Sequence, residues 1–374
     1  MTLSGGGRGS RGEESISGSA SPKLLAARLL PLACTCAALI LTFFGLFEFD
    51  VPLTRFVRSL NDFQRDHLHN PWLARLSDTG DRLGKGESLA VLSVLLLAVG
   101  YGLKLTVWKG AGWQTLLAHG LAGLSNNLLK HLVGRARPKF MHSGKLELSP
   151  LSGSGWDSFP SGHSMASFAV ATVLTVRFPK ARWVIIPFAV AIAASRVLRG
   201  AHFLTDAAGG AVLGALMGMV AANPWKDWRA SLEAALFRLT PFLAGLLVAV
   251  WTIGHHPVDH WAAPQLIGTG LALSLIVLVG QELLIVKPAL RPDFLTQSRA
   301  RGLIAFGLGM YTGSVWVAAT VLLACIASWL RTDSTEQETA AGSHRFWIQE
   351  AAFGLGVLLA LYTMSELRGA LPMV

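Results

Sequence analysis

Long apolar runs alternate along this chain with short polar connections. Several runs reach the roughly 20 residues that a helix needs to cross a bilayer, and they lack the strict apolar–polar alternation of a membrane barrel. Backbone polar groups in lipid must find partners within the protein, so continuous apolar runs predict membrane-spanning helices. We expect ten spans, at 24–47, 87–104, 112–132, 161–177, 183–200, 204–222, 236–254, 264–286, 302–330 and 351–367.

Composition supports the same class of protein. Hydrophobic residues make up 52% of the chain and charged residues 14%, whereas about a quarter of a soluble domain is charged. The predicted fold class is therefore an all-α, polytopic membrane helix bundle. The net charge of +10 does not indicate a nucleic-acid partner, because no basic stripe interleaved with aromatic residues accompanies it. Cys34, Cys36 and Cys325 lie inside apolar runs and are interpreted as small buried side chains.

The charge of the connections predicts the orientation in the membrane, because lysine and arginine accumulate on cytoplasmic loops. The basic connections are 104–109, 177–182, 226–229 and 287–301. By contrast, 255–261 holds neither residue and 331–350 carries more acid than base. The stretch 1–23, rich in glycine, serine and arginine, is expected to be a disordered cytoplasmic tail. Ten spans then place both termini in the cytoplasm of a bacterial-type inner membrane.

This orientation brings 48–86, 133–160 and 201–203 together on the outer side. Between 49 and 85, apolar residues are spaced among charges. That pattern fits one or two amphipathic helices at the membrane interface, and it fits a solvated loop nearly as well.

Three polar segments stand at the ends of predicted spans on that outer side. They are Lys130-His-Leu-Val-Gly-Arg-Ala-Arg137-Pro138, Phe159-Pro160-Ser161-Gly162-His163-Ser164 and Ser195-Arg196-Val-Leu-Arg199-Gly-Ala-His202-Phe-Leu-Thr-Asp206. Taken singly, the first has a plain interpretation as cations reaching from a helix end, and the second as a capped helix start. Ionisable residues that border membrane spans are nevertheless functional candidates, since their burial in lipid is costly.

Elementary chemistry points to an anion site. A helix that begins near Ser161 presents unpaired N–H groups and a partial positive charge, which together bind phosphate well. If the connection 199–206 is helical, His202 and Asp206 lie one turn apart on one face. The carboxylate is then able to hold the imidazole N–H and fix its tautomer, as in a nucleophile with its orienting group.

Read together, the segments spell K-x6-R-P, P-S-G-H and S-R-x5-H-x3-D. In these three segments the chain resembles the type-2 phosphatidic acid phosphatase superfamily, which also includes bacterial vanadium haloperoxidases and glucose-6-phosphatase. Every signature position is present, in order and at the family's spacing. The resemblance covers about residues 24–222, expected to form a six-helix lipid phosphatase core. It does not cover 236–367, an additional four-helix transmembrane region of unknown role.

The resemblance implies a role for each signature residue. His202 is expected to attack phosphorus and form a phosphohistidine, Asp206 to orient it, and His163 to protonate the leaving oxygen. The implied phosphate-binding residues are Lys130, Arg137, Ser161, Gly162 and Arg196. No metal or other cofactor is implied, since the three cations neutralise the charge on the phosphoryl oxygens.

Two further groups of residues have both a functional and a plainer interpretation. Arg135, Lys139 and Arg199 stand beside the signature cations. They fit a wider positive field for a diphosphate or a polyanionic head group, but surface charges near lipid head groups are the favoured interpretation. The cluster of histidines and aspartate at 255–260 has residue types that suit zinc. Its spacing matches no strong zinc template, so an interfacial polar loop is favoured.

The sequence therefore predicts a membrane enzyme that hydrolyses a lipid phosphate or diphosphate at the extracytoplasmic face. Undecaprenyl diphosphate is favoured over phosphatidylglycerol phosphate and lipid A. Transfer of the phosphate to another lipid would use the same intermediate and stays open. A haloperoxidase is disfavoured because those relatives are soluble, and a transporter because the ionisable residues gather mainly at one face. The expected partners are the lipid substrate and the membrane, without nucleic acid.

Overall fold

The computed structural model describes residues 22–67, 72–140, 147–254, 263–286, 296–332 and 344–370. Within these ranges the regular structure is helical, apart from an isolated bridge between Arg135 and Leu148. The all-α membrane bundle predicted from the sequence is confirmed. All but the last two residues of the predicted tail, 1–23, lie outside the described residues, as does the cluster at 255–260.

Membrane-spanning character is clearest in five of the described helical segments. By length and composition these are Leu29–Phe47, Pro179–Leu198, Leu204–Ala222, Trp225–Gly254 and Ala263–Gln281. A sixth span results if Trp72–Leu83 and Gly86–Gly102, which meet at a 54° bend, cross as one broken helix. Of the other expected spans, 112–132, 161–177 and 351–367 stay predictions.

The first helices lead the chain to the outer connections and back. They are α1 (Pro22–Phe47), α2 (Asp50–His67), α3 (Trp72–Leu83), α4 (Gly86–Gly102) and α5 (Thr106–Val133). The described residues of 48–86 lie mainly in the helices α2 and α3, and of the two expected forms the helical one is correct. Along α2, Thr54 and Val57 are buried, whereas the charged residue between them, Arg55, is exposed. This division is that of an amphipathic helix lying against other helices.

The centre of the fold is the pair α6 (Gly162–Arg177) and α8 (Leu204–Ala222), with α7 (Arg182–Leu198) between them in sequence. Glycines on α8 let the backbone of α6 approach closely. A Cβ on Gly210 would meet the Ser161 carbonyl oxygen at 2.5 Å, and one on Gly214 would collide with the Met165 carbonyl. This contact holds the start of α6 against the start of α8.

The carboxyl-terminal part of the chain holds α9 (Trp228–Gly254), α10 (Ala263–Val286), α11 (Gln297–Tyr311), α12 (Val315–Thr332) and α13 (His344–Glu366). The single span predicted at 302–330 is wrong, because α11 and α12 are two helices packed against each other. Gly313 lies in the turn between them with φ of +82°, a conformation that glycine adopts without steric cost.

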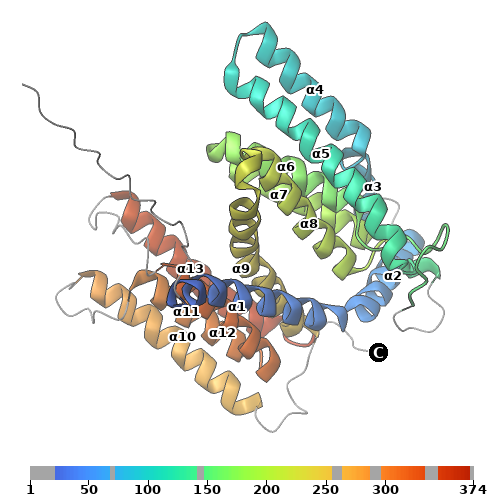
Figure 1. Ribbon diagram of the computed structural model, residues 1–374. Coiled ribbons are helices and arrows are strands. Elements are labelled where there is room, and N and C mark those ends of the chain that lie inside the picture. The colour runs from blue at the N-terminus through green and yellow to red at the C-terminus, as the bar shows by residue number, and fades with distance from the viewer. Residues whose placement is uncertain are drawn as a thin grey trace, which may run out of the picture.

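Figure 1 shows two groups of helices connected by α9: α4–α8 in one, and α1 with α10–α13 in the other. Although α1 belongs to the expected phosphatase core, 24–222, it packs mainly against α9 and α12. Leu46, Leu247 and Val317 meet there in one apolar cluster. The region of unknown role therefore shares a core with the first helix.

Two contacts fix the direction of the last helices. The helices α1, α5 and α7 finish at one end of the bundle, which we call the site end. Near the starts of α11 and α13, Arg301 pairs with Glu350. At the other end of α13, the N–H of Gly369 donates to the carbonyl of Thr252, 2.9 Å away, and the neighbouring Trp251 ring contacts Phe49 at 5.5 Å.

The direction of α13 differs from the predicted topology. Sequence analysis places 287–301 and 331–350 on opposite sides of the membrane. The Arg301–Glu350 pair instead puts the starts of α11 and α13 at the same end of the bundle. Because α1 runs toward the site end and α13 finishes there, the two termini of the described chain leave the bundle at opposite ends. The additional turn between α11 and α12 causes this difference.

Candidate active site

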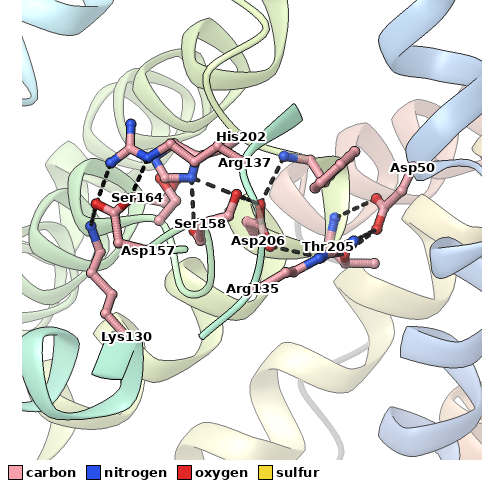
Figure 2. Close-up of polar contacts among 12 residues, drawn as sticks. Asp50, Lys130, Arg135, Arg137, Asp157, Ser158, Ser164, His202, Thr205 and Asp206 are labelled. Carbon is pink, nitrogen blue, oxygen red and sulfur yellow. Dashed lines mark hydrogen bonds and ion pairs between the residues drawn. The ribbon is translucent and has the colours of Figure 1, made fainter. Parts of the chain in front are cut away.

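The three signature segments meet at the site end. Lys130 is in the last turn of α5, and Gly134, with φ of +57°, ends that helix and turns the chain toward Arg137. The N–H of Ser161 donates to the Asp206 carbonyl at 3.0 Å, which joins the start of α6 to the first turn of α8. Figure 2 shows the resulting row of polar side chains, which runs from Lys130 at one end to Asp50 at the other.

His202 lies in the connection before α8, and its side chain is 3% exposed. Its Nδ1 lies 2.8 Å from the Ser158 carbonyl oxygen. A carbonyl only accepts hydrogen bonds, so Nδ1 carries the proton and Nε2 of the neutral ring keeps its lone pair. Burial lowers the pKa of His202, and the nearby Asp206 carboxylate opposes this shift only in part. The imidazole is therefore neutral at neutral pH.

Asp206 stands behind this histidine. Its Oδ2 is 3.8 Å from Nδ1 of His202 and accepts closer bonds from Ser158 Oγ at 2.5 Å and from the Phe203 N–H at 2.9 Å. The connection before α8 is not helical, because α8 begins only at Leu204, yet the carboxylate still lies near the imidazole. The carboxylate thus orders the loop that presents the Ser158 carbonyl, while its charge faces the imidazole at slightly longer range.

Arg135 is neither part of a wider phosphate field nor the surface charge that sequence analysis favoured, because its side chain is buried. Its guanidinium is buried between Asp206 Oδ1 at 2.7 Å and Asp50 Oδ2 at 2.8 Å, and it donates to Thr205 Oγ1 at 2.7 Å. The Phe203 ring covers one side at 4.3 Å. Burial raises the pKa of Asp50 to about 6, against the pull of Arg135. This group ties α2, α8 and the loop after α5 together.

Lys130 and Arg137 share a carboxylate that sequence analysis did not single out. Asp157 accepts from Arg137 Nε at 2.8 Å and Nη2 at 2.7 Å, and Lys130 Nζ is 3.7 Å from Asp157 Oδ2. The hydrogen bonds from Arg137 contribute most to lowering the pKa of Asp157, to about 2. The pair keeps two of the three predicted phosphate ligands in place before an anion arrives.

A second unforeseen carboxylate, Asp81 on α3, serves the other side of the site. It pairs with Arg196 Nη1, and its Oδ1 lies 3.3 Å from Nε2 of His163. Its Oδ2 lies 3.2 Å from Arg199 Nη1. No local pattern marks Asp81, because it is 49 or more residues from every signature position. Only the packing of α3 on α7 brings it here.

The start of α6 supplies the remaining signature residues. Ser161 is fully buried at the N-cap position, but its side chain caps no backbone N–H. Ser164 Oγ donates to Ser161 Oγ at 3.0 Å instead. A Cβ on Gly162 would approach the Asn126 side-chain amide to 3.2 Å. The first N–H groups of α6 are thus free of side-chain caps, as a phosphate-binding helix start requires.

Comparison with known proteins identifies the family to which the chain belongs. The model of the PAP2 superfamily matches residues 111–230. A lipid A 1-phosphatase of Rhizobium etli is 34% identical over 167 residues, 40% of this chain and 71% of that protein. A phosphatidylglycerophosphatase B of Bacillus subtilis is 31% identical over 165 residues, 40% of this chain and 74% of that protein. The chain belongs to the PAP2 superfamily.

Two further PAP2 comparisons have narrower scope. A lipid A 1-phosphatase of Rhizobium johnstonii is 39% identical over 103 residues, which span 27% of this chain and 42% of that protein. The crystal structure of a PAP2-type phosphatidylglycerolphosphate phosphatase from Bacillus subtilis matches 51% of this chain and 94% of its own, with 26% identity and a TM-score of 0.39. The PAP2 match begins after Asp50 and Asp81, so both carboxylates lie outside it.

Proposed function

We propose that this chain is a membrane phosphatase that hydrolyses a lipid phosphate or diphosphate through a phosphohistidine on His202, at the extracytoplasmic face. The observation that carries the proposal is the state of His202: a buried, neutral imidazole whose Nδ1–H is held by a carbonyl, with Arg137 and Arg196 within electrostatic range. A neutral nucleophile between cations is what attack on a phosphate dianion requires.

The first step forms a bond from Nε2 of His202 to phosphorus and breaks the phosphorus–oxygen bond to the lipid. Lys130, Arg137 and Arg196 neutralise the equatorial oxygens, and the free N–H groups at the start of α6 add partial positive charge. The imidazole becomes cationic as it is phosphorylated. The Asp206 carboxylate, 3.8 Å from Nδ1, stabilises that charge.

His163 moves the proton. It donates a proton to the departing lipid oxygen, and then takes one from the water that attacks phosphorus. The nitrogen–phosphorus bond breaks, inorganic phosphate leaves, and His202 returns to its neutral form. Asp81 holds His163 near Arg196 for both steps.

Three lipids are candidates for the substrate. Relatives of this chain are named for lipid A and for phosphatidylglycerophosphate. The third candidate is undecaprenyl diphosphate, which the sequence analysis favours. A lipid-embedded substrate suits a site formed at the ends of membrane helices, because the acyl or prenyl tail then stays in the bilayer. We place this end outside the cytoplasm, since the basic connections 104–109, 177–182 and 226–229 lie at the opposite end.

The test is phosphate release by the purified full chain from these lipids and from phosphatidate, with and without chelator. The wild type and His131→Ala, a change of an exposed histidine in the same region, should release phosphate in both conditions. His202→Ala should release none and form no acid-labile phosphoenzyme. Phosphate release by His202→Ala would contradict the proposal, and so would loss of phosphate release by the wild type when chelator is added. An added acceptor lipid distinguishes transfer from hydrolysis.

A further inference from the structure

A polar pocket opens beside the signature cations. Its volume is about 580 Å³, and it lies between α2, the loop after α5 and the end of α7. Arg137 and Arg196 form its boundary with the phosphate site, and Ala201, the residue before His202, also lines it. The described residues that line it include no aliphatic or aromatic side chain larger than alanine. Such a wall suits a polar head group rather than an acyl chain.

The charge of the pocket is positive. Beyond the two signature arginines, its lining contains Arg58, Lys139 and Arg199, against the carboxylates Asp62 and Asp81. Both carboxylates are already paired, and among the described residues neither pairs with Arg58 or Lys139. Arg199 also pairs with Asp78 at 3.0 Å. Asp81 is shared by Arg196 and Arg199, and Asp62 pairs with Arg65 at 2.7 Å.

Two of these cations have no carboxylate partner among the described residues. Lys139 Nζ lies 4.6 Å from the centre of the Phe140 ring, and Arg58 Nη2 donates to the Pro138 carbonyl at 2.6 Å. The bond from Arg58 attaches α2 to the loop that carries Arg137. It therefore fixes a second positive group close to the first phosphate site, with donors of the guanidinium left for a ligand.

We propose that Arg58 and Lys139, with Arg199, form a second anion subsite that binds an anionic group retained next to the phosphate under attack. The inference rests on the proposed phosphatase function and specifies its substrate class: lipids with two anionic groups. The second group is the inner phosphate of a lipid diphosphate or the phosphodiester of phosphatidylglycerol phosphate. Lipid monophosphates without such a group leave the subsite empty.

The experiment compares kcat/KM for two pairs of lipids. One pair is a polyprenyl diphosphate and the matching monophosphate, and the other is phosphatidylglycerol phosphate and phosphatidate. In Lys139→Gln we expect the ratio of the two-anion to the one-anion lipid to fall about tenfold, as for loss of one hydrogen bond to a charged group. Lys139→Arg should keep the ratio, and so should Arg75→Gln, which removes an exposed arginine of α3 outside the pocket. The pair that responds identifies the source of the second anion.

Binding supplies a readout that does not depend on turnover. Methylenediphosphonate should bind the full-length wild type about tenfold more tightly than phosphate, and Arg58→Gln and Lys139→Gln should both remove that preference. An unchanged preference and an unchanged kcat/KM ratio would overturn the subsite while leaving the phosphatase intact. Absence of phosphate release from every lipid, with the diphosphonate preference preserved, would instead overturn the proposed function.

Discussion

Asp157 holds Arg137 through two parallel hydrogen bonds, to Nε at 2.8 Å and to Nη2 at 2.7 Å. The same carboxylate lies 3.7 Å from Lys130. An incoming phosphate must therefore compete with a protein anion for two of its three proposed cationic ligands. The planar, bidentate geometry makes Asp157 a strong competitor.

This relationship predicts tighter binding of free phosphate when the carboxylate is neutralised. In Asp157→Asn, inorganic phosphate should inhibit at a concentration about tenfold lower than in the wild type, since one charge-assisted interaction no longer opposes it. Inhibition of phosphate release measures the effect. Asp66→Asn, at an exposed position of α2, is the matched control. Weaker inhibition in Asp157→Asn would show that the carboxylate supports phosphate binding instead.

The ionisation of Asp157 also has a pH consequence. Its pKa is lowered to about 2. A depressed carboxyl pKa stabilises the fold above the ordinary value of about 4, and this contribution is lost as the pH falls through about 2. The pairing is thus complete throughout the working range of the enzyme, and the inhibition by phosphate in Asp157→Asn should exceed that in the wild type at every pH from 5 to 8.

The pH profile of activity should be bell-shaped, because His202 must be neutral and His163 protonated. Burial lowers the pKa of His202, so its neutral form persists below the ordinary histidine value of about 6.5. The acid limb of kcat/KM should therefore lie below that pH. A profile that is flat from acid to neutral pH, or an acid limb above about 7, would reject the assignment.

Arg135 is predicted to stabilise the fold. Arg135→Ala leaves Asp50 and Asp206 buried without their shared cation, which costs about 3–5 kcal/mol of unfolding free energy. Thermal unfolding in detergent should show a clear decrease in the Tm of Arg135→Ala. The Tm of Arg135→Lys should lie between those of Arg135→Ala and the wild type, because lysine keeps the charge but lacks the planar fork. If Arg135→Ala keeps the wild-type Tm but no longer binds phosphate, Arg135 is a phosphate-binding residue and the structural role is wrong.

Asp50 should make stability depend on pH. Burial raises its pKa from 3.8 to about 6. A raised carboxyl pKa contributes stability that is complete below the unfolded value and is lost as the pH rises through the folded value. The Tm of the wild type relative to Asp50→Asn should thus decrease between pH 4 and pH 7. A constant difference across this range would show that Asp50 keeps one charge state.

The direction of α13 predicts the location of the carboxyl-terminal end. The Gly369 N–H bonds to the Thr252 carbonyl at the site end. An alkaline phosphatase reporter fused after Ala370 should be active outside the cytoplasm, and a fluorescent reporter at the amino terminus should fluoresce inside. Fluorescence of the same reporter after Ala370 would instead support the ten-span topology. Phosphatase activity of each fusion confirms that it has folded.

The sequence by itself determined the membrane class and the proposed reaction centre. Apolar runs report membrane helices because lipid excludes unpaired backbone polar groups. The signature residues of PAP2 proteins stand in short segments, so their spacing shows in one dimension. His163, His202 and Asp206 are examples.

The tertiary structure decided what neutralises and orients those residues. Asp50, Asp81 and Asp157 have no recognisable spacing, because packing of α2, α3 and a loop against other helices creates their contacts. An exposed arginine and one buried between two carboxylates also look alike in sequence, which is why Arg135 was interpreted as a surface charge near lipid head groups. The turn at Gly313 was missed for a related reason. Hydropathy does not change across a hairpin whose two helices are both apolar, and only their packing reveals that the chain reverses there.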